Sequence, residues 1–257
     1  GDTSGVRGQP RQLVIFAGDP SPADTAAGFA FHINWGDGSP SQTVISSQPL
    51  GLEHVFAAEG TYTIQVTATD TDGGTSVAAT HTITITAASI QPDTWNPGKT
   101  ALAVGGTLGN DGIVISPVSN DGTVSVSING VSLGTVQPTG RILVYAQAGD
   151  DTVQIVDSIP LTAVVYGGEG NDRLKGGGGH DILLGGDGDV LIGGYGADRR
   201  VGNSDDDVLI AGFTKYDAND AALCAILSEW TSARDYAARV KNLMGDVNSS
   251  QFASRLN

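Results

Sequence analysis

Aspartate residues recur at regular spacing in residues 167–210, and they are the side chains best suited to chemistry in this chain. The segment contains five copies of a nonapeptide, G-G-x-G-x-D-x-U-x with U apolar: GGEGNDRLK, GGGGHDILL, GGDGDVLI, GGYGADRRV and GNSDDDVLI. The aspartates at position six are Asp172, Asp181, Asp189, Asp198 and Asp207. A nine-residue period of glycine and aspartate predicts a parallel β-roll that carries Ca²⁺ in its turns.

The order of residues within each copy gives the physical reason. Glycines in the first half suit a turn, and D-x-U-x in the second half suits a short strand with its apolar side chain turned inward. Two copies make one coil, so Asp172, Asp189 and Asp207 share one edge, while Asp181 and Asp198 share the other. Carboxylate and carbonyl oxygens at such an edge match the hard oxygen ligands that Ca²⁺ prefers. Stacked carboxylates repel one another without a cation, so we expect metal binding and folding to be coupled.

The predicted metal site combines the aspartates with turn residues at positions two and four of the copies. Its members are Gly168, Gly170, Asp172, Gly177, Gly179, Asp181, Gly186, Gly188, Asp189, Gly194, Gly196, Asp198, Asn203, Asp205 and Asp207. No set of cysteines or histidines accompanies them to suit a softer metal. A series of Gly-Asp turns without metal is the alternative that the pattern leaves open.

Three departures from the repeat bear on this prediction. The third copy is one residue short, so 17 residues separate Asp172 from Asp189, whereas a regular 18 separate Asp189 from Asp207. Arg200 takes the inward apolar place of the fourth copy, and Asn203 and Asp205 replace the usual glycines of the fifth. Asn and Asp tolerate left-handed backbone geometry. We therefore expect the Asp189/Asp207 pair to form the most regular of three inter-turn sites.

These repeats resemble the hemolysin-type calcium-binding repeats, also called RTX repeats, of secreted bacterial proteins. The resemblance covers residues 167–210 and rests on five copies in succession. It implies a calcium-loaded parallel β-roll, an extracellular location and, in many members, type I secretion.

Composition limits the class of protein. The chain has 257 residues with 37 glycines, a charged fraction of 16% and a net charge of −15. This glycine-rich composition favours an all-β, turn-rich chain, and the negative charge argues against nucleic acid as a partner. The single cysteine excludes an internal disulfide, and no apolar run is long enough for a membrane span. Because the chain starts at Gly1 without methionine, we expect a piece of a longer protein.

Alternating apolar residues predict an antiparallel sandwich over residues 11–87. Two stretches, WGDG at 35–38 and HVFAAEGTYTIQVTATD at 54–70, resemble a PKD domain, which is an Ig-like module. The resemblance implies a spacer or interaction module without catalysis, with other extracellular proteins or surface polysaccharide as its partners. We expect His54 to be a half-buried structural residue; the alternative is a metal ligand.

Residues 88–100 are predicted to be a linker and residues 101–166 a β-rich segment that leads into the roll and caps its N-terminal end. Residues 125–136 predict a hairpin with a type I′ turn at Asn129-Gly130. Ser132 lies in a G-x-S-x-G pattern, but no helix follows it, so a catalytic serine is not expected. Asp111 and Asp151 occupy the aspartate place of two degenerate repeats.

Residues 213–257 are predicted to be a helical tail. Leu223, Ile226, Leu227 and Trp230 have helical spacing, and so does a second set, Tyr236, Val240 and Leu243. The expected first cap is Asp217 or Asn219, and a capping box of Ser232 with Asp235 and a stop at Gly245 delimit the second helix. Short helices need a surface to pack on, and the open end of the roll is the expected one. A partner-binding groove is the alternative.

The predicted fold class is all-β: an Ig-like β-sandwich, a β-rich segment, a parallel β-roll over residues 167–212 and a short C-terminal helical pair. The predicted function is calcium binding by a non-catalytic, modular protein at a bacterial cell surface or outside the cell. The alternative is an accessory region of a secreted protease or glycosidase whose catalytic domain lies outside this chain. This combination of modules resembles large surface proteins of planctomycete-like bacteria.

Overall fold

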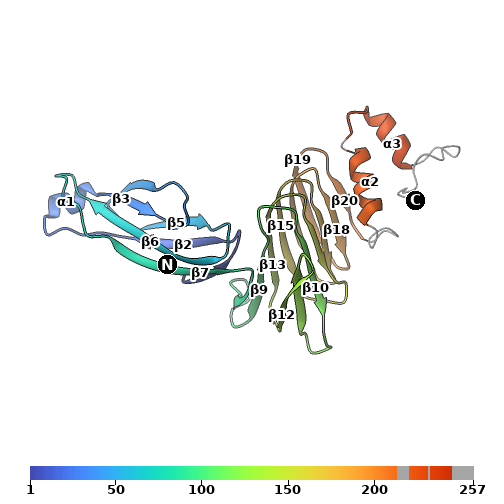
Figure 1. Cartoon of the computed structure of the whole chain (residues 1–257), viewed down its shortest axis with the longest axis horizontal. Coiled ribbons are helices and arrows are strands. Elements are labelled where there is room, and N and C mark those ends of the chain that lie inside the picture. Colours follow the sequence, from blue (N-terminus) through green and yellow to red (C-terminus); the bar gives the residue numbers. More distant parts are fainter. Residues whose placement is uncertain (213–219, 231, 245–257) are drawn as a thin grey trace. The chain divides into compact units, whose positions relative to one another are not determined.

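The computed structural model describes residues 1–212, 220–230 and 232–244. The chain divides into two compact units, Gly1–Ala87 and Ala88–Asn257. Strands dominate both units, and helices are few and short (Figure 1). This confirms the predicted all-β class with a short C-terminal helical pair. The predicted caps Asp217, Asn219 and Gly245 lie outside the described residues.

The first unit is built from two layers in which most strands pair antiparallel. A five-stranded sheet has the order β1-β7-β6-β3-β4, and β2 pairs with β5 in a second sheet. The elements of this unit are β1 (Ser4–Val6), β2 (Pro10–Ile15), α1 (Pro22–Ala27), β3 (Phe29–Asn34), β4 (Gln42–Ser46), β5 (Leu50–Val55), β6 (Gly60–Thr69) and β7 (Ala79–Thr86). β1 pairs with β7 in parallel, so the first unit begins before residue 11, where the predicted sandwich starts.

Period-two alternation explains the core of this unit. Phe29, Phe31 and Ile33 alternate along β3 and are buried, whereas the residues between them are more exposed. Ile83 and Ile85 do the same on β7. Because successive side chains of a strand point to opposite faces, one face of the five-stranded sheet forms a continuous apolar core.

His54 is held by the residues of the WGDG stretch. Its ring stacks on Trp35 with centroids 4.3 Å apart, and its Nε2 lies 2.7 Å from Asp37 Oδ2. Burial alone would raise the pKa of Asp37, but hydrogen bonds from Ser39 and His54 outweigh it and hold that pKa below its ordinary value. These contacts occupy the imidazole in packing and a hydrogen bond, which supports the structural role expected for His54.

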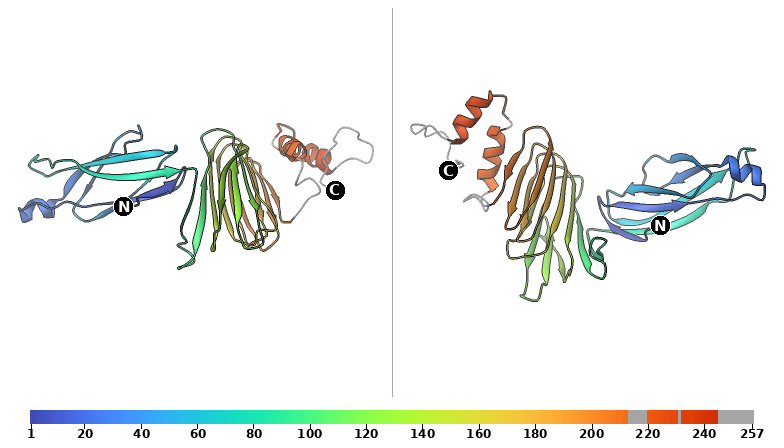
Figure 2. Two further views of the ribbon diagram at one scale, coloured as in Figure 1. Left: turned by 60° about the horizontal axis from the view of Figure 1, so that its bottom comes forward. Right: turned by 180° about the vertical axis from the view of Figure 1, so that it is seen from behind.

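The second unit is a flattened coil of two sheets. One has the order β12-β11-β10-β14-β16-β18-β20 and the other β19-β17-β15-β13-β9-β8. The strands are β8 (Ala88–Pro92), β9 (Thr100–Gly105), β10 (Gly112–Pro117), β11 (Val124–Ile128), β12 (Val131–Val136), β13 (Ile142–Ala148), β14 (Thr152–Ile155), β15 (Ala163–Glu169), β16 (Arg173–Gly177), β17 (Ile182–Asp187), β18 (Val190–Gly194), β19 (Arg199–Ser204) and β20 (Val208–Ile210). From β13 onward the chain alternates between the two sheets, and these strands stack in parallel (Figures 1 and 2).

Parallel stacking starts well before the glycine-rich repeats. β13 pairs in parallel with both β9 and β15, and β14 pairs in parallel with both β10 and β16. Residues 101–166 therefore supply the first coils of the roll, whereas the sequence analysis placed its start at Gly167. Residues 88–100, expected as a linker, include β8, which pairs antiparallel with β9.

The hairpin of β11 and β12 adds an antiparallel edge to this roll. Asn129 and Gly130 have φ values of 53° and 75°, as a type I′ turn requires. The predicted hairpin and turn are confirmed. Ser132 lies on the exposed strand of this hairpin, where no helix follows.

The interior of the roll contains columns of apolar side chains from both sheets. Val104, Val144, Val165 and Leu183 lie in register along one sheet and are fully buried. Arg200 continues this column at the last strand, in register with Leu183. The departure of the fourth copy thus puts a guanidinium group where the other strands present an aliphatic side chain.

The helical pair, α2 (Asp220–Trp230) and α3 (Tyr236–Met244), belongs to the second unit. Leu223, Ile226 and Leu243 form one apolar cluster with Val190 and Ile192 of β18. These two residues alternate with Leu191, which lies in register with the buried Leu174, so the helices cover the outer face of the seven-stranded sheet. The expectation that they close the open end of the roll is wrong, because this outer apolar surface gives them a partner.

The start of α3 also differs from the prediction. The N–H of Ala238 donates to Asp235 Oδ1 at 2.9 Å, which makes Asp235 the cap of a helix that begins at Tyr236. The expected capping box placed this role on Ser232, but the Ser232 hydroxyl has no hydrogen-bond partner in the described chain.

Candidate metal centre

Five aspartates form a column along one edge of the roll. The N–H of each of the first four donates to Oδ1 of the aspartate on the next coil, from Asp111 to Asp151 at 2.7 Å and onward through Asp172, Asp189 and Asp207 at 2.8 Å each. The repeats predicted the last three members at this edge. The structure adds Asp111 and Asp151, because the same turn recurs on the earlier coils.

A shorter column occupies the opposite edge. The Asp181 N–H donates to Asp198 Oδ1 at 3.0 Å, and the Ala163 N–H donates to Asp181 Oδ1 at 2.7 Å. The structure thus places the two sets of predicted aspartates on separate edges. Each column uses only one oxygen of each carboxylate for its own support.

In five of these aspartates the second carboxylate oxygen is buried and has no hydrogen-bond partner in the described chain. In the described chain, Oδ2 accepts no hydrogen bond in Asp151, Asp172, Asp181, Asp189 and Asp198. Buried polar groups are almost always paired, because an unpaired one loses its hydration without compensation. A repeated set of orphaned oxygens therefore indicates that something outside the polypeptide, a cation or a proton, completes these turns.

The pKa values of these carboxyls also reflect the lack of partners for their buried oxygens. Burial, and then the charge of the neighbouring aspartate, raises the pKa of Asp172 and of Asp181 to about 7. The same two causes raise the pKa of Asp189 to about 6. Backbone hydrogen bonds oppose the shifts without cancelling them. Without a cation, these groups hold protons close to neutral pH.

Position one of each copy lies close against the Oδ2 atom of the aspartate in the same copy. A Cβ atom at Gly176 would lie 2.5 Å from Asp181 Oδ2 and 2.6 Å from the Gly193 carbonyl oxygen. At Gly167 it would lie 2.2 Å from Asp172 Oδ2. A side chain at either position would collide with these atoms, so glycine is required there, and the atoms around it are carboxylate and carbonyl oxygens of the kind that Ca²⁺ binds. The residues present fit Ca²⁺.

The turn glycines serve two different purposes. Residues at positions two and four are left-handed at Gly168 and Gly170 (φ 120° and 115°) and also at Asn203 and Asp205 (φ 87° and 63°). The left-handed geometry expected for Asn203 and Asp205 is confirmed. By contrast, Gly179 does not have positive φ, but a Cβ there would lie 2.4 Å from the Leu161 carbonyl oxygen.

The remaining predicted glycines follow the same division. Gly188, Gly194 and Gly196 are left-handed, whereas Gly177 and Gly186 are not. At Gly186, a Cβ would lie 1.7 Å from the Gly168 carbonyl oxygen of the neighbouring strand. Glycine is needed at these positions either for the turn itself or for the close stacking of coils.

The upstream turn is completed by protein groups. Asp111 Oδ1 accepts from Asn129 Nδ2 at 2.7 Å, and its Oδ2 accepts from Thr107 Oγ1 at 3.0 Å. Gln147 Nε2 donates to the Gly106 carbonyl oxygen at 2.6 Å. The Asp111 turn thus lacks the orphaned oxygen of the repeats. Sequence reasoning missed these partners, because no local pattern links positions that meet only across coils.

Metal-free protein is expected to gain stability as the pH falls from 8 to 5. A carboxyl whose pKa is higher in the folded than in the unfolded state makes the folded roll bind more protons. The roll therefore loses stability as the pH rises through the raised pKa values of Asp172, Asp181 and Asp189. Each carboxyl contributes a slope of up to about 1.4 kcal/mol per pH unit. Urea denaturation of calcium-depleted protein at several pH values measures this slope, and a free energy of unfolding that instead increases with pH contradicts the assignment.

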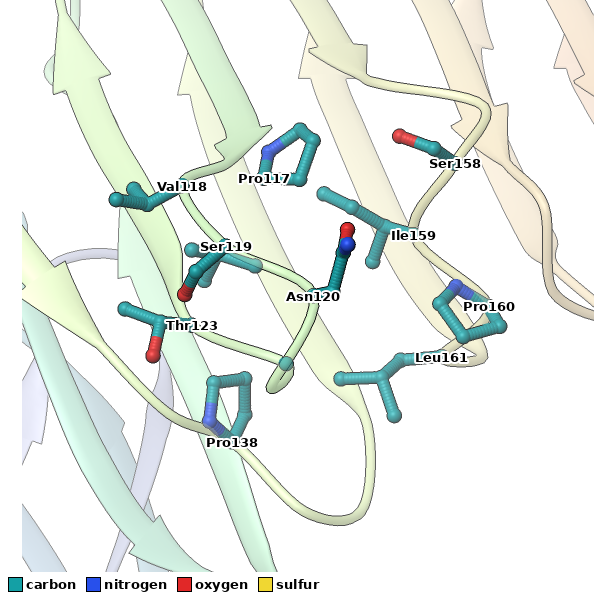
Figure 3. A pocket seen from close by; sticks show the side chains of 12 residues that line it. Pro117, Val118, Ser119, Asn120, Thr123, Pro138, Ser158, Ile159, Pro160 and Leu161 are labelled. Atoms are coloured by element: carbon teal, nitrogen blue, oxygen red, sulfur yellow. The ribbon is translucent and has the colours of Figure 1, made fainter.

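One hollow in the second unit is lined by residues that belong to neither column (Figure 3). It encloses about 500 Å³, and its lining includes Pro117, Asn120, Pro138, Ile159 and Leu161. No titratable side chain lines it. In the described parts of the chain, no three histidine, cysteine, aspartate or glutamate side chains converge on a metal position either. An ion in the repeat turns would therefore depend on backbone carbonyls as well as on carboxylates.

Comparison with known families agrees with this geometry. Residues 5–86 match the PKD domain, and residues 164–192 match a family model that describes four copies of the RTX calcium-binding nonapeptide repeat. No curated protein and no solved structure matches the chain, so the resemblance to proteins of planctomycete-like bacteria has no support from a relative. No helix in the described residues is long and apolar enough to cross a membrane. The chain is a modular protein with RTX repeats, which imply calcium binding.

Proposed function

We propose that this chain belongs to a non-catalytic, modular protein of the bacterial cell surface or extracellular medium, in which Ca²⁺ completes and orders the β-roll after secretion. The observation that carries the proposal is the repeated buried carboxylate oxygen without a partner. The family match independently concerns the turns that contain Asp172, Asp181 and Asp189.

The ligands available in these turns favour Ca²⁺ over other common ions. Asp172, Asp181 and Asp189 supply carboxylate oxygens, and the carbonyls of stacked glycines such as Gly193 lie beside them. Ca²⁺ accepts irregular cages of carboxylate and carbonyl oxygens, whereas Mg²⁺ requires a smaller, near-octahedral cage and releases its water reluctantly. When bound, Ca²⁺ supplies the positive charge that allows these buried aspartates to remain ionised at neutral pH.

The non-catalytic part of the proposal rests on the nature of the matched modules. PKD domains and RTX repeats are non-catalytic. We expect the PKD domain to space the roll from, or to contact, other extracellular proteins or surface polysaccharide. The alternative is that the chain is an accessory region of a secreted protease or glycosidase. Both proposals include the same calcium binding, but the alternative also requires a catalytic domain joined to this chain. The complete gene distinguishes the two.

A calcium titration of the whole chain tests the proposal. Far-ultraviolet circular dichroism is recorded from chelator to millimolar Ca²⁺ at pH 8, with Mg²⁺ as the control ion, and bound Ca²⁺ is counted by equilibrium dialysis. We expect β-structure and protease resistance of the roll to increase with Ca²⁺ but not with Mg²⁺. A spectrum that is complete in chelator, together with no bound Ca²⁺, overturns the proposed function.

A further inference from the structure

Arg200 places a positive charge inside the last coil of the roll. It lies on β19 in register with Leu183, which is fully buried in the apolar column. Its side chain is 17% exposed, so most of it is within the protein. An arginine in such a column needs a nearby negative group, because an unpaired buried charge is strongly unfavourable.

That negative group is Asp198. Arg200 Nη1 lies 3.6 Å from Asp198 Oδ2, and the Asp198 side chain is fully buried. Neither atom has a hydrogen-bond partner in the described chain. Asp198 Oδ1 already accepts a hydrogen bond from the Asp181 N–H. The guanidinium therefore faces Asp198 Oδ2, which takes no part in the column.

The guanidinium also lies beside the first glycine of its copy, next to the Asp198 carboxylate. A Cβ atom at Gly193, position one of this copy, would lie 2.3 Å from Asp198 Oδ2 and 2.5 Å from Arg200 Nη1. The corresponding space at Gly176 is bordered instead by Asp181 Oδ2 and a carbonyl oxygen. The two turns have the same carboxylate, but in one of them a cationic nitrogen stands beside it.

We propose that Arg200 is the resident cation of the Asp198 turn, so that this turn binds no Ca²⁺ whereas the turns of Asp172, Asp181 and Asp189 do. The inference rests on the proposed function, because it assigns where calcium binds within the roll. A divalent ion at Asp198 would have to displace the guanidinium or lie against it, and like charges at such distances repel. The last coil then stays ordered when calcium is scarce and offers a fixed end for the coils before it.

Substitution of Arg200 tests the inference in the full chain. Arg200→Leu restores the aliphatic residue of the other copies, and Arg200→Lys keeps the charge as the matched control. Bound Ca²⁺ is counted by equilibrium dialysis and by isothermal titration calorimetry. We expect Arg200→Leu to bind one more Ca²⁺ than the unmodified chain and Arg200→Lys to bind the same number. We also expect Arg200→Leu to melt at a lower temperature in chelator, because Asp198 is then a buried carboxylate without a partner.

The other outcomes are equally informative. If Arg200→Leu folds and binds the same non-zero number of Ca²⁺ ions as the unmodified chain, Arg200 only closes the end of the roll and the inference fails. If the unmodified chain binds no Ca²⁺, the proposed function itself fails. Should Arg200→Leu not fold, Asp198→Asn in a chain that keeps Arg200 decides the question: an unchanged Ca²⁺ count supports the inference, and the loss of one ion overturns it.

Discussion

Gly168→Ala is expected to destabilise the roll by about 4 kcal/mol, enough to leave most of a marginally stable domain unfolded. Gly168 has φ 120°, which an L-residue with a side chain rarely adopts, and its Cβ would lie 1.7 Å from the Gln147 carbonyl oxygen. Gln147 and Gly168 are in register on β13 and β15, so relief of this clash requires two stacked coils to separate. The loss combines backbone strain with a steric conflict between main chains.

Gly134→Ala separates these two contributions. Gly134 also has positive φ, 102°, but a Cβ there meets nothing within 4 Å. It should cost only the strain of the left-handed backbone, about 1–2 kcal/mol. Urea denaturation of both variants in saturating Ca²⁺ measures the difference. Equal losses would show that the turn at Gly168 can open without cost, and the stacking argument would then be wrong.

Asp189→Asn is expected to change the stability of the roll in opposite directions with and without calcium. Asparagine keeps the Oδ1 acceptor for the Asp172 N–H but removes the charge. In Ca²⁺ the variant loses a ligand, and we expect the Ca²⁺ concentration that half-orders the roll to rise by at least about tenfold. In chelator at pH 8, above the pKa of about 6 at Asp189, the variant should melt at a higher temperature because a buried charge has been removed.

Asp72→Asn is the control for this reversal. It removes the same charge from an exposed loop of the PKD domain. We expect it to leave the Ca²⁺ requirement and the melting temperature of the roll unchanged in both conditions. If Asp189→Asn lowers stability equally in Ca²⁺ and in chelator, the carboxylate is a structural acceptor and the metal assignment at this turn is wrong. Differential scanning calorimetry resolves the melting of the two units.

Local patterns were sufficient for much of the fold. Alternation at Phe29, Phe31 and Ile33 predicts a half-buried strand, since side chains of a strand alternate between two faces. The Asn129-Gly130 pair predicts its turn, because these residue types tolerate positive φ. The nine-residue period of the aspartates predicts two edges of carboxylates, since one full coil contains two copies. In each case the information lies within a few neighbouring residues.

The site was determined only in part by such patterns. Asp151 joins the column of Asp172 and Asp189 because parallel coils bring distant turns together, although its repeat is degenerate. The orphaned oxygens cannot be inferred from a motif, because the burial of an atom depends on every strand stacked around it. The helical pair likewise packs on apolar residues of the outer face of β18. No local sequence pattern shows whether such residues point outward or inward.

The sequence by itself determined that this protein has a PKD domain, an RTX roll and aspartates at the spacing of a calcium site. Only the tertiary structure decided which turns lack a partner for their carboxylates. Asp111 meets Asn129 and Thr107, Asp198 meets Arg200, and Oδ2 of Asp189 meets no protein donor. The reason is physical: periodicity fixes which residues recur along the chain, whereas charge balance depends on which groups the coils bring within a few ångströms.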